Sequence, residues 1–187
     1  MTKRVSNNTM ISEVTRYFDY QAGLYNAKNA SLLWGIQRQR EMAAVMCLFD
    51  NIDREEFLEL GCGSGFYTRQ LLNLGAAHIT AVDFSKQMLE QLPDSGVTGI
   101  HADATSVELN KKFKYILSAG LLEFVSNPTE VLTNARKYAT DDAMMVCLIP
   151  PANFGGYIYR WFHQRHGFEI SLFSPESLSR MAKDAGW

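Results

Sequence analysis

The sequence predicts an α/β fold, in which helices cover both faces of a doubly wound, mainly parallel sheet. Short apolar runs alternate with segments of helical periodicity between residues 55 and 150, as expected for successive right-handed strand–helix–strand crossovers. One of these runs, 57–60, ends at Gly61, and glycines follow at 63 and 65 before a helical pattern begins. This order predicts a buried strand, a tight turn and the start of a helix.

The individual elements are predicted from the periodicity of apolar residues and from the residues that cap helices or form turns. Ser31 can cap a first helix at 31–49, where apolar residues recur at helical intervals. Ser174 and Pro175 are typical of a helix start, and Gly186 can end that last helix. Between them we expect strands at 56–60, 78–83, 97–101, 114–119 and 143–149, and helices at 65–74, 85–92 and 128–139.

Length and composition fit one domain over residues 1–187. The net charge is −2 without a basic block, so the sequence gives no indication of a nucleic-acid partner. No apolar run approaches the ~18 residues of a transmembrane segment, and no signal peptide is visible. The cysteines Cys47, Cys62 and Cys147 are scattered and lack metal spacing. We expect reduced thiols, no metal and a cytoplasmic location.

The glycine turn indicates the class of ligand. Glycines let a ligand lie against bare main chain, and the following helix start presents free N–H groups to it. A dinucleotide fingerprint requires a small residue at position 66, where this chain has Phe66, and Gly65 comes one residue early. With Glu59, the run reads E-x-G-x-G-x-G. It closely resembles the first motif of class I S-adenosylmethionine-dependent methyltransferases, which have a Rossmann-like fold.

Two acids follow the next two strands. Asp83, about twenty residues past the glycine turn, is placed to accept both ribose hydroxyls of an adenosine, with Phe84 against the adenine. Alternatively Asp83 caps the next helix, a role that Ser85 can also fill. Asp103 resembles the family residue that accepts from the adenine amino group, and the resemblance implies that the N–H of Ala104 reaches a ring nitrogen.

The segment 118–128 resembles the fourth motif of the family, whose main chain lines the methionine half of the cofactor. Ser118 and Ala119 are assigned to the cofactor on this ground. Relatives that act on quinone-type phenols, and are proposed to use a metal, often carry an acid and a histidine where this chain has Gly120 and Phe124. That subclass and any metal are therefore disfavoured.

The resemblance implies a methyltransferase that uses S-adenosylmethionine and a small acceptor. We expect residues 1–50 to form a helical arm, 55–150 the cofactor-binding core and 151–187 the acceptor-side tail. We assign Glu59 as an indirect anchor of the cofactor's amino group and Cys62 as a small residue of the glycine loop. The full cofactor set is Glu59, Gly61, Cys62, Gly63, Gly65, Asp83, Phe84, Asp103, Ala104, Ser118 and Ala119.

No catalytic residue is assigned. Residues able to act as a general base near the pocket are Tyr17, Tyr25, Glu123, His163 and His166. The aromatic segments 17–25 and 157–168 are expected to become ordered over the cofactor, or else to pack as fixed elements. The aromatic and basic stretch 154–168 suits an aromatic or amphipathic acceptor with an anionic group, with contact to a membrane surface. A helix packed on the sheet fits the same stretch equally well.

Two alternative functions remain. An NAD-dependent oxidoreductase is contradicted at Phe66, and no Tyr-x-x-x-Lys pair is present. A non-catalytic module that binds S-adenosylmethionine or S-adenosylhomocysteine retains every motif above.

The end of the sequence carries a further expectation. Members of the family usually continue past 185–187 into an antiparallel hairpin, which we expect to be missing here. The apolar strand 143–149 is then a bare edge. We expect a homodimer or another partner to cover this edge, or the tail at 152–170 to do so.

Overall fold

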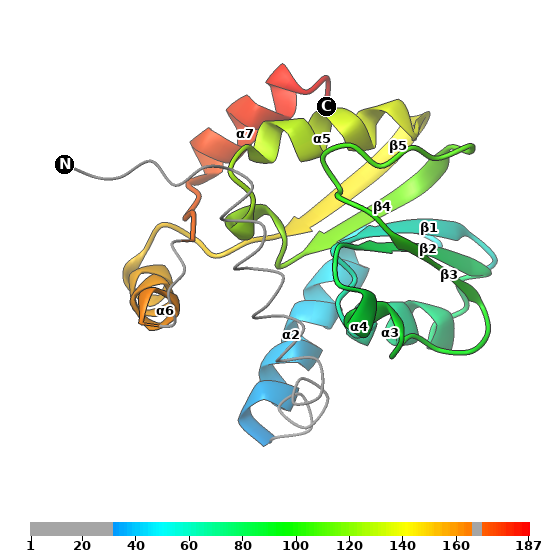
Figure 1. The fold of residues 1–187 in the computed structure, drawn as a ribbon, viewed down its shortest axis with the longest axis horizontal. Helices are drawn as coiled ribbons and strands as arrows, with labels where there is room; N and C mark the ends of the chain where they lie inside the picture. Colours follow the sequence, from blue (N-terminus) through cyan, green and yellow to red (C-terminus); the bar gives the residue numbers. More distant parts are fainter. Residues whose placement is uncertain (1–31, 166–169) are drawn as a thin grey trace.

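A five-stranded parallel sheet forms the centre of the computed structural model, which describes residues 32–165 and 170–187. Its strands are β1 (Glu56–Leu60), β2 (His78–Asp83), β3 (Val97–His101), β4 (Phe113–Ala119) and β5 (Ala139–Leu148), in the order β3-β2-β1-β4-β5. All four strand pairings are parallel. Figure 1 shows the strands side by side in this order, which reverses between β1 and β4. In open α/β sheets such a reversal is where a ligand crevice is expected, beyond the carboxyl ends of the strands.

Helices cover both faces of the sheet (Figure 1). On one face lie α2 (Leu32–Leu48), α3 (Phe66–Asn73) and the short α4 (Lys86–Leu89), and on the other lie α5 (Pro128–Lys137) and α7 (Pro175–Asp184). Between β4 and α5 runs a single 3-10 turn, η1 (Leu122–Phe124), and α6 (Phe154–Gln164) precedes α7. The predicted α/β fold with a doubly wound sheet is therefore confirmed.

Each face of the sheet buries its own apolar cluster, because strand side chains alternate between the two faces. Leu58, Leu60 and Ile116 pack toward α5 and α7. Phe57 and Tyr115 pack toward α2 and α3, with ring centroids 5.2 Å apart. The strands are thus rigidly held, and so are the loops at their carboxyl ends.

The structure corrects two of the expected elements. The helix expected at 85–92 is only Lys86–Leu89, since Leu92 lies in a turn that packs against the glycine loop. The last strand begins at Ala139 rather than 143, because Ala139 still pairs with Phe113 before the register shifts and Tyr115 pairs with Met144. Polar residues at 140–142 occupy the irregularity, so the apolar pattern starts only after it.

The strand β5 lies at the edge of the sheet, as expected. All strand pairings of the described residues are parallel, so an antiparallel hairpin is not found among them. Coverage of β5 by a second copy or another partner stays a prediction. The aromatic segment 17–25 lies outside the described residues.

Candidate functional site

The loop between β1 and α3 is shaped by glycines with positive φ. Gly61 has φ 71°, and a Cβ added there would lie 2.9 Å from Cβ of Leu121. Gly63 has φ 52° and faces open space, with nothing within 4 Å of an added Cβ. The main chain at Gly63 is therefore open to a ligand, whereas Gly61 allows the loop to lie against Leu121.

Asp83 joins this loop to the end of the neighbouring strand. Its Oδ2 accepts a hydrogen bond from the backbone N–H of Gly63 at 2.8 Å, and its Oδ1 accepts one from the N–H of Ser85 at 2.8 Å. Ser85, rather than Asp83, caps α4, since its side chain accepts from the N–H of Met88. The alternative of Asp83 as the helix cap is therefore wrong.

Two adjoining pockets open on either side of Asp83. One, the loop pocket, is lined by the glycine loop together with side chains from α2, α3 and the segment after β4. The other, the Asp103 pocket, is lined by the turn after β3 and the segment 124–126. The two pockets share the lining residues Gly61, Asp83, Phe84, Leu121 and Phe124. The two pockets are therefore neighbours, and Asp83 is the one acidic residue among the five that they share.

The turn after β3 is held firmly from within. Oδ1 of Asp103 accepts from both the N–H and the hydroxyl of Thr105, each at 2.8 Å. The buried amide of Asn134, on α5, donates to the carbonyls of Ala104 at 3.2 Å and Val107 at 3.0 Å. Asp103, Ala104 and Thr105 line the Asp103 pocket on this fixed turn.

Arg38 brings a cation to the loop pocket, and the sequence analysis missed it. Its Nη1 lies 3.1 Å from the hydroxyl of Tyr67 and 3.3 Å from Oε2 of Glu41, and the Tyr67 hydroxyl donates to the same Glu41 oxygen at 2.9 Å. The guanidinium also lies 5.8 Å from the ring centroid of Phe66. Arg38 and Tyr67 line the loop pocket, so a charged group of a ligand can meet an oriented guanidinium there.

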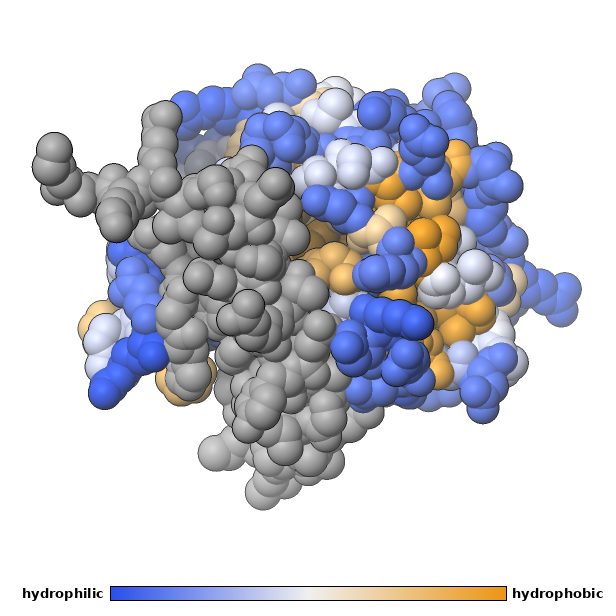
Figure 2. Space-filling model, viewed as in Figure 1, coloured by the Kyte–Doolittle hydropathy of each residue, from blue (hydrophilic) through white to orange (hydrophobic). Residues whose placement is uncertain are grey.

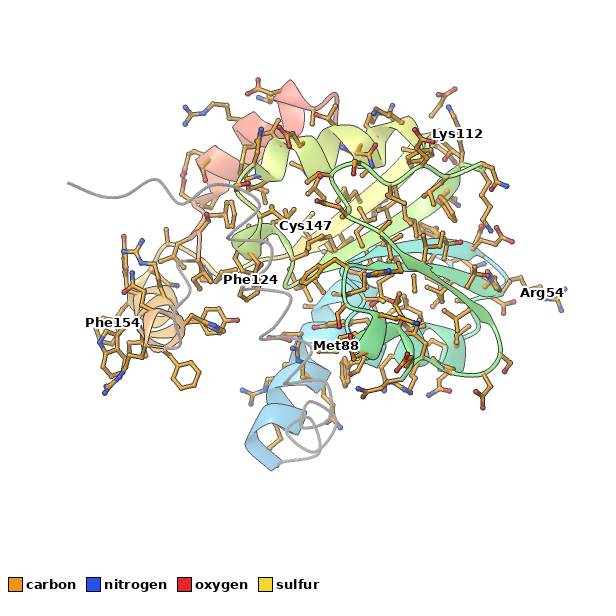
Figure 3. The ribbon with its side chains drawn as sticks, viewed as in Figure 1. Arg54, Met88, Lys112, Phe124, Cys147 and Phe154 are labelled. Carbon is orange, nitrogen blue, oxygen red and sulfur yellow. The ribbon has the colours of Figure 1, made fainter. Side chains whose placement is uncertain are left out.

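Apolar side chains make up most of the remaining wall. Leu121 and Phe124 come from the segment after β4, and Met88 comes from α4. In Figure 3, Phe124 lies between the strand ends and α6, and Met88 lies on the side of α4. Figure 2 shows hydrophobic residues on the right of this face, with hydrophilic residues around them. The apolar lining of the loop pocket partly screens a bound ligand from water.

Comparison with known proteins identifies the family. A family model described as a methyltransferase domain matches residues 34–187, most of the chain. The chain belongs to the methyltransferase domain family. This confirms the resemblance to class I S-adenosylmethionine-dependent methyltransferases that the four motifs indicated.

Individual relatives of this methyltransferase domain are distant. A malonyl-acyl-carrier-protein O-methyltransferase of Anoxybacillus flavithermus is 26% identical over 117 residues, which cover 60% of this chain and 42% of the relative. The chain thus spans less than half the length of that curated relative.

Two solved structures share the fold. A methyltransferase from Thermotoga maritima, described as a possible histamine N-methyltransferase, superposes with a TM-score of 0.78 at 22% identity, over 92% of this chain and 80% of that one. Magnesium protoporphyrin IX methyltransferase from Synechocystis PCC 6803, with bound S-adenosylhomocysteine, superposes with a TM-score of 0.72 at 14% identity. The superposition covers 95% of this chain and 89% of that one.

Most of the residues predicted for the cofactor line the two pockets of this methyltransferase domain. The pockets bring together Gly61, Cys62, Gly63, Asp83, Phe84, Asp103, Ala104 and Ala119. Glu59, Gly65 and Ser118 lie outside the linings. Gly65, with φ 80°, precedes α3, where an added Cβ would lie 2.7 Å from Leu92. Ser118 is fully buried.

Glu59 acts behind the glycine loop. Its carboxyl is buried and accepts a hydrogen bond from the Thr68 hydroxyl at 2.5 Å, which joins β1 to α3. Burial raises the pKa of Glu59 to about 8, the Thr68 bond opposes this rise, and the charge of Asp83 adds to it. The role of Glu59 as an indirect anchor of the cofactor's amino group stays a prediction.

The residues considered as general bases lie in different places. Glu123 is 3% exposed, and its Oε2 makes no hydrogen bond within the described part of the chain. Burial raises the pKa of Glu123 to about 7, the nearby Arg38 charge lowers it and Glu41 raises it. His163 is buried on α6, with its ring 5.6 Å from that of Phe124. Tyr17, Tyr25 and His166 lie outside the described residues.

Within residues 32–165 and 170–187, no three His, Cys, Asp or Glu side chains lie close enough together to hold a metal ion. No helix in the same two ranges is long and apolar enough to cross a membrane. The cytoplasmic location stays a prediction.

We predict that the Glu123→Gln variant gains stability relative to the unchanged chain as the pH rises from 5 to 8. Because the folded pKa is raised from 4.5 to about 7, the folded chain holds a proton that the unfolded chain has lost, and stability falls with rising pH through this window. The variant lacks this loss in the free energy of unfolding, which amounts to roughly 2.5 kcal/mol between pH 5 and pH 8. Urea unfolding at both pH values measures the difference.

The exposed Glu108→Gln variant is the control for this measurement, since its carboxyl is not buried. A difference between the Glu123→Gln variant and the unchanged chain that stays constant from pH 5 to 8 would contradict the raised pKa.

Proposed function

We propose that this chain binds S-adenosylmethionine across the loop pocket and the Asp103 pocket, and transfers its methyl group to a small amphipathic acceptor. The observation that carries the proposal is that Asp83 lines both pockets, the one at the glycine loop and the one at the Asp103 turn. A nucleoside joined to an amino acid needs a site of this form. Membership of the methyltransferase domain family supports it.

The Asp103 pocket suits the adenosine half. A carboxylate oxygen accepts more than one hydrogen bond, so Asp83 can hold Gly63 and Ser85 and still accept from a ribose hydroxyl. Asp103 makes both of its bonds to Thr105 through Oδ1, and its Oδ2 suits an adenine amino group. Phe84 lines both pockets and suits contact with the base.

The loop pocket suits the methionine half. The guanidinium of Arg38 can receive its carboxylate, and the open space at Gly63 leaves room for the amino-acid chain. Glu41 and Tyr67 fix the orientation of Arg38 through their hydrogen bonds. Arg38 is therefore proposed as a cofactor-binding residue in addition to those predicted from the sequence.

Transfer of a methyl group from a sulfonium is an in-line displacement, in which the acceptor atom bonds to the methyl carbon as the carbon–sulfur bond breaks. The donor is reactive, so the main contribution of the protein is alignment, which is worth about 7–11 kcal/mol in well-oriented reactions. Ala119 and Gly120 leave room at the loop pocket for the acceptor to approach, and Leu121 and Phe124 exclude water. Glu123, with a pKa near neutrality, is a candidate base if the acceptor arrives protonated.

We predict that the Asp83→Ala and Asp103→Ala variants each bind S-adenosylmethionine and S-adenosylhomocysteine at least about tenfold more weakly. Each variant removes a hydrogen bond to a charged group, which contributes roughly 1.5–3 kcal/mol. Isothermal calorimetry measures the affinities, with Asp94→Ala, an exposed aspartate, as the matched control. Unchanged affinity in both variants, or equally tight binding of NAD, would contradict the proposal.

We predict that Arg38→Met lowers the affinity for S-adenosylhomocysteine by about tenfold. The affinity for 5′-methylthioadenosine stays unchanged, because this ligand lacks the carboxylate. Arg40→Met on the same helix is the control, since Arg40 is exposed and lines neither pocket. Calorimetry of both ligands makes the test. Equal weakening of both ligands would show that Arg38 acts on the fold and not on the carboxylate.

A further inference from the structure

Helix α6 turns its most apolar side toward solvent. Phe154 is 81% exposed, Tyr157 51%, Ile158 52%, Trp161 56% and Phe162 49%. These residues recur every three or four positions and so share one face of the helix, called here the aromatic face of α6. A helix that only packs on a sheet buries such a face, so its exposure indicates an external partner.

The opposite side of α6 is firmly seated. A Cβ added to Gly156 would lie 1.9 Å from the carbonyl oxygen of Pro151, so the helix backbone rests directly on that residue. His163 packs against the ring of Phe124 at 5.6 Å. The N–H of Ala152 donates to the carbonyl of Phe173 at 2.9 Å, which closes the base of the segment that carries α6. The orientation of the aromatic face is therefore set by specific contacts on its other side.

Cationic side chains border the aromatic face. The Arg160 guanidinium lies 5.2 Å from the ring centroid of Tyr157, and that of Arg165 lies 4.7 Å from the ring of Trp161. The sequence from 143 to 168 contains no Asp or Glu. Aromatic rings flanked by arginines, in a stretch of sequence without acids, are complementary to a surface that is apolar inside and anionic at its boundary.

We propose that the aromatic face docks α6 in the plane of an anionic lipid surface. The rings enter the boundary between headgroups and acyl chains, and Arg160 and Arg165 meet the anionic headgroups. Figure 3 shows Phe154 on the side of α6 away from Phe124, so the face projects from the molecule. A projecting ridge needs a matching groove on a protein partner but none on a deformable lipid layer, which favours lipid as the occupant.

Docking also bears on the acceptor. Phe124 lines both pockets and touches His163 on the inner side of α6. A lipid surface on the outer face of α6 therefore lies on the far side of this helix from Phe124, and an amphipathic acceptor in that surface would have to pass α6 to reach the pocket. This last step rests on the proposed methyl transfer, whereas the docking itself does not.

Sedimentation with sucrose-loaded vesicles tests the docking on the full chain. We expect vesicles of equal phosphatidylglycerol and phosphatidylcholine to bind at least about tenfold more protein than phosphatidylcholine alone. The double variant Phe154→Ser/Trp161→Ser loses at least about tenfold of this binding, and Arg160→Gln/Arg165→Gln loses the preference for phosphatidylglycerol. The control is Leu74→Ser, which removes a side chain that is 51% exposed on another surface and leaves binding unchanged.

Calorimetry with S-adenosylhomocysteine shows whether each variant keeps its fold and its cofactor site. Vesicle binding that persists unchanged in Phe154→Ser/Trp161→Ser would overturn the proposal. So would an absence of vesicle binding combined with self-association that the same double variant removes, because the face is then an interface between copies. Vesicle binding without any S-adenosylhomocysteine binding would support the docking and remove only the proposed methyl transfer.

Discussion

The carboxylate of Asp83 is the contact on which the arrangement of the site depends. By accepting from Gly63 and Ser85 at 2.8 Å each, it joins the glycine loop after β1 to the turn after β2. These loops belong to neighbouring strands whose pairing brings Leu60 beside Val82. The same residue also lines both pockets. A parallel sheet places these loop ends together, and one buried acid locks them.

Other contacts hold the loops from outside. Arg69 donates to the carbonyls of Ser64 at 2.6 Å and Gly65 at 3.0 Å, and also to the carbonyl of Gln91. Asn134 does the same for the Asp103 turn from the opposite face of the sheet. Helices on both faces of the sheet therefore hold the loops at the carboxyl ends of the strands. A positioned site of this kind is what an alignment-dependent reaction requires.

Much of the fold could be predicted from the sequence because its signals are local. The strands at 56–60, 78–83 and 97–101 match their predicted bounds, since each apolar run is bounded by a turn. The start of β5 was missed because its first paired residue precedes a polar irregularity at 140–142. Local periodicity carries no information about such a shift in register.

The site was only partly predictable for the same reason. Asp83 and Asp103 were identified from their place after a strand, and both line the pockets. Arg38 was not identified, because its position depends on how α2 packs beside Tyr67, a contact between residues 29 apart in the chain. Glu59 and Ser118 lie within strands and are buried away from the pockets. A motif shows which segments form the site, whereas packing decides which side chains reach it.

The central claim is that one cofactor occupies both pockets at once. A titration of the ¹⁵N-labelled chain with S-adenosylhomocysteine, followed by backbone amide chemical shifts, tests it most directly. We expect the amides of Gly63, Ala104 and Phe124 to shift together with one dissociation constant, and NAD to cause no comparable change. Shifts confined to one pocket, or an equal response to NAD, would contradict the account.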